Sequence, residues 1–453
     1  MNYKQKFHEL GIEIPSILLP RNNFMTKWPV IACDQFTQDR DYWQKAKDII
    51  SEEPSTLNLI FPEVFLNDDD AAQRIKKIHS TMKNYLQNNV FAKPKQGFIY
   101  IERDTPFQKK RRGLIAAVDL EKYEWQQEAR PLIRCTEGTV PERLPPRMDI
   151  RRGASLELPH VLLLIDDEKD AFLPALGEMV KNSAPVYNTP LIMDSGSISS
   201  WFVEPETNGQ PSTAVSLIVE KLEELFNRSV SRYNGINAGA GNPFLFAVGD
   251  GNHSLATAKE IWNELKAKGA DESHPCRYAL VEIENIYDTA IEFEPIHRLV
   301  FDIDYDKLIS LLSRLPDFSF KPVENIQELS YLCKEQRSSL RKGNKFGIIC
   351  EGRYALIETS AEGIATACLQ PLLDEYAKDN PLLIDYIHDE AELFRLSAVS
   401  NDRQTAGILL PPVQKSGLFE TVARLGPLPR KSFSMGHSIE KRFYLECRSL
   451  NSN

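Results

Sequence analysis

The stretch FLFAVGDGNHSLATAK, residues 244–259, decides the fold. The apolar run 244–248 predicts a buried strand, the glycines that follow predict a tight turn, and a helix begins near Ser254. A carboxylate, an imidazole, a hydroxyl and an amide stand within this turn. A strand that feeds a helix in this way points free backbone N–H groups outward at the positive end of the helix dipole. The stretch therefore predicts a site for phosphate or another anion.

The turn supplies both binding and catalytic candidates. Glycines allow a ligand to approach the backbone closely, and we expect these residues to bind phosphate: Gly249, Gly251, Asn252 and Ser254. Asp250 and His253 are the candidate catalytic residues, since an imidazole with an ordinary pKa of ~6.5 can act as acid or base near neutral pH. The alternative is a simple strand-to-helix turn in which Asp250, Asn252 or Ser254 caps the helix and His253 lies on the surface.

Residues 133–153 form a second candidate region, rich in arginine and interrupted by proline. Prolines disfavour a continuous helix or strand, so we expect a long loop. Its guanidinium groups suit phosphate or carboxylate, and three of them are predicted to bind phosphate: Arg143, Arg147 and Arg152. Alternatively, acidic neighbours neutralise the arginines: Glu137, Glu142, Asp149 and Glu157.

Asp34 ends a short apolar strand over residues 28–35, and ligand sites in α/β proteins gather at such strand ends. Asp34 and Asp250 are therefore candidate metal ligands. One of the single histidines could join them in a metal-dependent hydrolase: His160, His297 or His388. No two histidines have the i, i+4 spacing of a helical zinc site.

Composition favours an ordinary globular protein of two or three domains, with 453 residues, 42% hydrophobic and 26% charged. The net charge of -10 argues against general nucleic-acid binding and against an anionic membrane surface. Seven scattered cysteines without a CxxC pair fit a reducing compartment. Since no apolar run approaches the ~20 residues that span a bilayer, we expect a cytoplasmic protein.

Alternating elements predict a mixed α/β fold in which helices flank a mixed sheet. We expect a main α/β domain over residues 1–299, carrying the turn and the arginine loop, and a smaller α/β portion over residues 300–453. Helices are predicted at 71–88, 212–226 and 369–386, the last interrupted by Pro381. Strands are predicted at 159–166, 278–284, 353–359 and 443–446.

Four segments together resemble one bacterial and archaeal family, named "domain of unknown function 1015". They are residues 32–35 (ACDQ), 137–143 (EGTVPER), 249–258 (GDGNHSLATA) and 386–388 (YIH). The resemblance spans nearly the whole chain, and the family name implies no activity.

The turn is also similar to the phosphate turn of the ParB/sulfiredoxin superfamily. Asp250 and Gly251 match the Asp-Gly of that turn, and His253 matches its histidine. Asn252 stands where sulfiredoxin has its cysteine, and Ser254 stands where an arginine usually follows. This similarity implies a phosphate-binding turn whose additional positive charge comes from elsewhere, such as the arginine loop.

The leading hypothesis is an enzyme that binds a nucleotide or a phosphorylated small molecule at the turn, with phosphoryl transfer as its reaction. ATP or another nucleotide with Mg²⁺ is the expected cofactor, and a small anionic molecule is the expected partner. The alternatives are a non-catalytic nucleotide or metabolite sensor and the metal-dependent hydrolase described above. The sequence leaves the substrate and the oligomeric state open.

Overall fold

The computed structural model describes residues 2–107, 109–233, 243–335, 343–380, 382–398 and 404–451. Contacts divide the chain into two units. Unit 1 comprises residues 1–135, 139–291 and 437–453, and unit 2 comprises residues 136–138 and 292–436. The boundary expected from the sequence, at 299/300, lies close to the division between residues 291 and 292, and residues 437–453, which follow unit 2 in the sequence, belong to unit 1.

Unit 1 is built on a ten-stranded mixed sheet. Across the sheet the strands run β11 (Tyr187–Pro190), β12 (Ser197–Val203), β5 (Phe98–Asp104), β6 (Lys110–Asp119), β16 (Tyr278–Asn285), β10 (Leu162–Ile165), β15 (Phe246–Asp250), β8 (Ile133–Cys135) and β7 (Tyr123–Glu124), and β1 (Ile12–Glu13) pairs with β6. Strand β10 is parallel to β16 and antiparallel to β15. The expected mixed α/β fold is confirmed.

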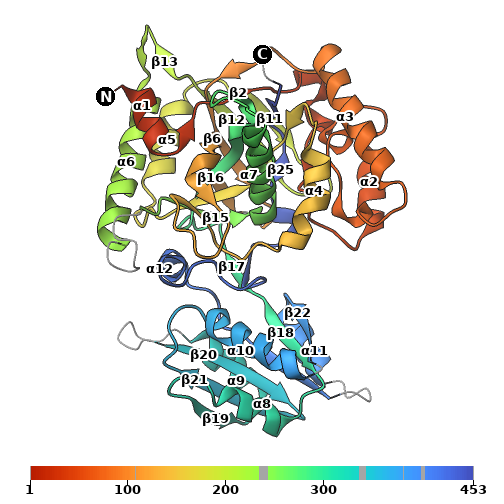
Figure 1. Cartoon of the computed structure of the whole chain (residues 1–453), viewed down its shortest axis with the longest axis vertical. Helices are drawn as coiled ribbons and strands as arrows, with labels where there is room; N and C mark the ends of the chain where they lie inside the picture. Colours follow the sequence, from red (N-terminus) through yellow and green to blue (C-terminus); the bar gives the residue numbers. More distant parts are fainter. Residues whose placement is uncertain are drawn as a thin grey trace. The chain divides into compact units, whose positions relative to one another are not determined.

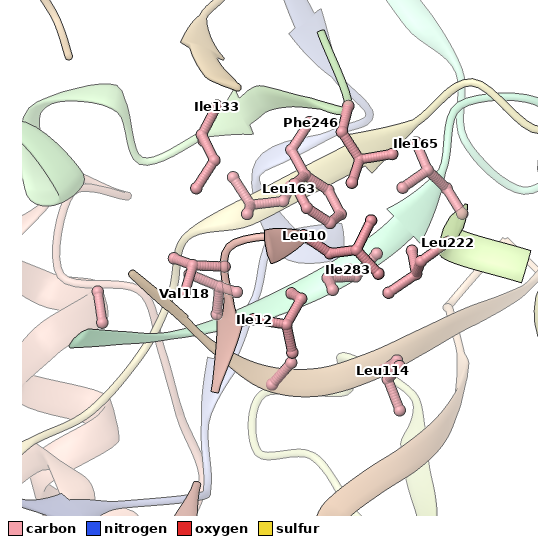
Figure 2. Packing of buried hydrophobic residues seen from close by; sticks show 14 of the residues in the cluster. Leu10, Ile12, Leu114, Val118, Ile133, Leu163, Ile165, Leu222, Phe246 and Ile283 are labelled. Carbon is pink, nitrogen blue, oxygen red and sulfur yellow. The ribbon is translucent and has the colours of Figure 1, made fainter. Parts of the chain in front are cut away.

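Alternate residues of β5 and β6 enter two cores, one on either face of the sheet. Leu114 and Val118 of β6 enter the first core, whereas Ile115 enters the second. Figure 2 shows Leu163, Phe246 and Ile283 of three neighbouring strands gathered near Leu222. The first core is covered by α1 (Tyr3–Glu9), α5 (Phe172–Val180), α6 (Thr213–Tyr233) and α7 (Asn252–Ala267). The second contains residues of α2 (Arg40–Ile50) and α3 (Ala71–Gln87), and Ile150 of α4 (Leu144–Arg151) packs against it.

Outside the main sheet, unit 1 contains short strand pairs, most of which join segments that are far apart in the sequence. Two of them use the end of the chain: β25 (Phe443–Tyr444) pairs with β3 (Val30–Ile31), and β26 (Arg448–Ser449) pairs with β9 (Leu156–Glu157). The others are β2 (Ser16–Ile17) with β4 (Lys95–Gln96) and β13 (Glu206–Thr207) with β14 (Gln210–Pro211).

A group of charged side chains is fully enclosed in unit 1, and we call it the buried charge cluster: Arg103, Arg111, Glu282, Glu284 and Arg442. The Nε atom of Arg442 lies 2.9 Å from Oε2 of Glu282, and Nη2 of Arg103 lies 3.6 Å from Oε1 of Glu284. Arg103 also donates to the backbone oxygen of Lys441 at 2.6 Å. The C-terminal segment is thus held to the sheet by buried ion pairs and hydrogen bonds.

Unit 2 contains a six-stranded antiparallel sheet. Its order is β19 (Ser319–Val323), β21 (Arg353–Thr359), β20 (Asn344–Cys350), β23 (Thr405–Leu409), β18 (His297–Phe301) and β22 (Leu383–Ile387). Its helices are α8 (Tyr305–Leu312), α9 (Ile326–Lys334), α10 (Ala365–Asp379), α11 (Glu390–Ala398) and α12 (Lys415–Leu425), and β17 (Phe293–Pro295) pairs separately with β24 (Phe433–Met435).

Two expectations need correction. The region 133–153 is not one long loop, because β8 and α4 occupy much of it. Pro145 and Pro146 fall in the first turn of α4, where a missing N–H costs the helix nothing. The predicted helix 369–386 ends at Asp379, and Leu383–Ile387 instead forms the edge strand β22 beside β18. Pro381 lies outside the described residues.

None of the helices in the described ranges combines the length and the apolar character that crossing a bilayer requires.

Candidate functional site

The turn between β15 and α7 is built by a bulge followed by a left-handed glycine. Leu162 of β10 faces Asp250 and Leu163 faces Val248, so Gly249 is the extra residue between them. Gly251 has φ +82°, and a Cβ atom there would lie 3.0 Å from Cα of Val161. Only glycine meets both conditions without strain. The bulge and the turn together set where α7 begins, at Asn252.

His253 is engaged by the backbone. Its Nε2 accepts a hydrogen bond from the N–H of Val140 at 3.2 Å. Burial, together with the positive charges of Arg147 and Arg143, lowers the pKa of His253 to about 4. The ring is therefore neutral at physiological pH, with its proton on Nδ1. An imidazole in this state can donate a hydrogen bond to an anion but adds no charge.

Ser254 belongs to a hydrogen-bonded chain that runs across three segments. Its Oγ lies 2.9 Å from Nε2 of His160, and Nδ1 of His160 lies 2.7 Å from the hydroxyl of Tyr444. That hydroxyl in turn donates to Sγ of Cys33 at 3.1 Å. A hydroxyl beside an imidazole that a third group orients is an arrangement suited to proton transfer.

The two candidate metal ligands already lie beside a histidine and a lysine. Asp34 Oδ2 lies 3.7 Å from Nε2 of His160, and Asp250 Oδ2 lies 3.3 Å from Nζ of Lys441. Burial alone favours a raised pKa at Asp34, but His160, Gln35 and Lys441 outweigh it and lower the pKa. Among the residues that the structure describes, no three His, Cys, Asp or Glu side chains gather to hold a metal ion. The metal assignment stays a prediction.

The predicted arginines divide between two environments. Helix α4 packs against α7 (Figure 1), and Arg147 projects from it with 17% of its side chain exposed, paired with Glu63. Arg143 is exposed, and its charge acts on His253. Arg152 instead pairs with Glu264 at 2.8 Å and with Asp149 at 2.7 Å on the exposed side of α7. Arg147 and Arg143 thus lie near the turn, whereas Arg152 is engaged farther along the helix.

A cavity of about 150 Å³ adjoins the first turns of α7, and we call it the α7 cavity. Ser254, His160, Arg147 and Tyr444 all contribute to its wall. Sequence reasoning did not assign Glu63, Lys441 or Tyr444 to the site. Residues 443–446 are predicted as a strand, but nothing local indicates that Tyr444 meets His160 through the pairing of β25 with β3.

Comparison with known proteins gives a family but no activity. A family model described as "Protein of unknown function (DUF1015)" matches residues 17–376. None of the curated proteins matches the chain. The local similarity of the turn to the ParB/sulfiredoxin superfamily stays a prediction.

Several solved structures show distant likeness. A conserved hypothetical protein from Pyrococcus furiosus has a TM-score of 0.34 and 12% identity, covering 73% of this chain and 90% of its own. A free serine kinase in complex with AMP has a TM-score of 0.38 and 10% identity, with 73% and 90% coverage. SbnI with a C-terminal truncation, from Staphylococcus aureus, has a TM-score of 0.35 and 10% identity, with 73% and 85% coverage. Likeness at this level assigns no function to the chain.

Proposed function

Since this chain belongs to the DUF1015 family, whose description names no activity, we propose a function from its own site: unit 1 binds a phosphorylated small molecule or nucleotide at residues 249–254 and transfers its phosphoryl group. The observation that carries the proposal is that Ser254 in the first turn of α7, Arg147 of α4 and His160 line one cavity, with Ser254 Oγ 2.9 Å from Nε2 of His160. Each of these features favours an anion or the movement of a proton beside it.

The anion end of the ligand would lie at the first turn of α7. Backbone N–H groups at that turn have no partner within the helix, and Gly251 lets a ligand approach them. Arg147 supplies the nearby charge that the neutral His253 does not. His253 supplies a neutral donor at Nδ1.

Proton transfer would use His160, which lies between Ser254 and Tyr444. Asp34 lies close enough to His160 to stabilise the imidazolium that forms when this base takes a proton. If Mg²⁺ takes part, Asp34 and Asp250 are the carboxylates that would face it, and it would neutralise charge on the transferring phosphoryl group. In the structure, Asp250 forms an ion pair with Lys441.

The proposal is tested by titrating the full chain with ATP, ADP and CTP, with and without Mg²⁺, in a calorimeter. We expect heat from at least one nucleotide, and a loss of that heat in Arg147→Ala. Absence of heat and of any thermal shift with all three would contradict nucleotide binding. Phosphate and simple phosphate esters would then be the remaining ligands to titrate.

Asp250→Asn separates an enzyme from a sensor. In an enzyme, the substitution should lower the transfer rate by orders of magnitude, because it removes the carboxylate charge that would face Mg²⁺. A sensor would use the same pocket without turnover, so the variant should keep its affinity for the nucleotide. Asp306→Asn, at an exposed aspartate of α8, is the matched control.

A further inference from the structure

The α7 cavity is mostly apolar, although it adjoins a polar turn. Its wall includes the side chains of Leu59, Phe61, Met82, Ile150, Leu156 and Leu280. These come from the segment before α3, from α3 and α4 themselves, and from β9 and β16. A ligand that enters this space meets hydrocarbon over most of its surface.

The charged groups in the wall are largely compensated by one another. Glu63 pairs with Arg147. Glu157 pairs with Arg151 and, at 2.7 Å, with Arg448, and it accepts from the N–H of Leu280 at 2.8 Å. A sugar or another polar group placed against the apolar wall would leave its hydroxyls without partners, at a cost of about 1–3 kcal/mol each.

The volume sets the size of the group that fits. A cavity of about 150 Å³ lined by Leu, Ile and Phe side chains binds benzene. The α7 cavity has this volume, and the apolar part of its wall is built from the same kinds of side chain. Ser254 and Arg147 lie in the same wall, so a group in the cavity can be bonded directly to an anion at the first turn of α7.

We propose that the ligand of this site is an amphiphilic phosphate ester whose apolar part, an aryl or branched alkyl group of about benzene's size, fills the α7 cavity. The proposal rests on the proposed function for its anionic end. It adds the chemical class of the rest of the molecule, which the turn and the arginines leave open.

The test is calorimetric titration of the full chain with phenyl phosphate, glycerol phosphate and inorganic phosphate. We expect phenyl phosphate to bind at least tenfold more tightly than the other two, because only its ring gains from leaving water. Equal affinity for phenyl phosphate and glycerol phosphate would overturn the inference while leaving anion binding intact.

Filling the cavity gives a second measurement. Ala258→Leu, on α7, places extra volume in the wall and should remove the advantage of phenyl phosphate while keeping the affinity for phosphate. If Ala258→Leu fails to fold, Ala154→Leu replaces it as the cavity-filling variant, because Ala154 lies in the same wall but between α4 and β9. The matched control is Ala72→Leu at an exposed position of α3. If both cavity variants keep the advantage, the apolar group lies elsewhere and the inference fails.

Failure of the anion site is distinguishable from failure of the cavity. If none of the three phosphates binds, the proposed function is wrong for these ligands, and benzene alone then tests the cavity. A higher Tm with benzene for the natural sequence, absent in Ala258→Leu, supports an apolar site. No change in Tm with benzene would overturn it.

Discussion

Strand β16 borders two very different interiors within four residues. Leu280 lies in the wall of the α7 cavity, whereas Glu282 and Glu284, farther along the same face of the strand, belong to the buried charge cluster. Burial and the neighbouring Glu282 raise the pKa of Glu284 to about 8. Beside the α7 cavity, burial likewise disfavours charge, because it lowers the pKa of His253 to about 4 and keeps the imidazole neutral.

This difference shows what each region can do. In the charge cluster, side chains are 0–1% exposed. Arg103 donates to the backbone oxygens of Glu440 and Lys441, and Arg442 pairs with Glu282, so the role of the cluster is to fix the C-terminal segment on the sheet. In the α7 cavity, polar groups lie at the edge of an apolar space and keep atoms that a ligand can reach. Buried charge indicates a structural role in the first case, and in the second it supports the proposed binding site.

The largest loss of stability is expected from Arg442→Met, which tests whether the charge cluster is structural. The substitution leaves Glu282 and Glu446 without their buried partner, and we expect unit 1 to lose about 3–5 kcal/mol of unfolding free energy. Urea unfolding followed by tryptophan fluorescence measures it, because all five tryptophans lie in unit 1. A loss below about 1 kcal/mol, the size expected of the control Arg40→Met at an exposed arginine of α2 in unit 1, would contradict a structural role for the cluster.

A smaller effect is expected from pH through His253. Its pKa is about 4 in the folded protein and ~6.5 when unfolded, so between these values the unfolded chain binds a proton that the folded chain does not. Stability of unit 1 should therefore fall by about 1–3 kcal/mol as pH falls from 6.5 to 4. His253→Asn should flatten this part of the profile, and the exposed control His8→Asn should not. Identical slopes in all three proteins would rule out a neutral His253.

Arg147→Ala sharpens the comparison on the cavity side. It removes the guanidinium nearest the anion, and we expect phosphate affinity to fall about tenfold, or ~1.4 kcal/mol. Calorimetry with phosphate measures the change, and Arg395→Ala in unit 2 is the control. Unchanged affinity would mean that the α7 N-terminus binds the anion without this side chain.

The smallest effect is expected from Arg152→Ala. Its partners Glu264 and Asp149 are solvent-exposed, so unfolding free energy should change by less than ~1 kcal/mol. Phosphate affinity should change less than twofold, because the guanidinium is engaged on the exposed side of α7. A loss equal to that of Arg147→Ala would restore the sequence prediction that Arg152 binds phosphate.

Local patterns predicted the elements that position the site. The strand and helix around residues 249–254 appear as β15 and α7, and the helix expected at 71–88 is α3. Periodicity succeeds here because each element buries a regular apolar face. It failed at 369–386, where the edge of the unit 2 sheet takes Leu383–Ile387 as a strand despite its helical spacing.

The site was only partly accessible to sequence reasoning. The turn residues are indicated locally by glycines that precede the start of a helix. Arg147 is indicated by the arginine-rich segment in which it lies. Tyr444 and Lys441 have none, since they reach the turn through β25 and a long-range pairing that no local spacing encodes. His160 could be weighed only as a single histidine, because its contact with Ser254 spans 94 positions.

The return of residues 437–453 to unit 1 has a consequence for synthesis on the ribosome. Unit 2 is translated between segments of unit 1, so residues 437–453 are synthesised after it, and only then can Arg442 pair with Glu282 and Tyr444 reach His160. Folding of unit 1 and assembly of the candidate site therefore depend on a segment that the ribosome adds only after all of unit 2 has been made.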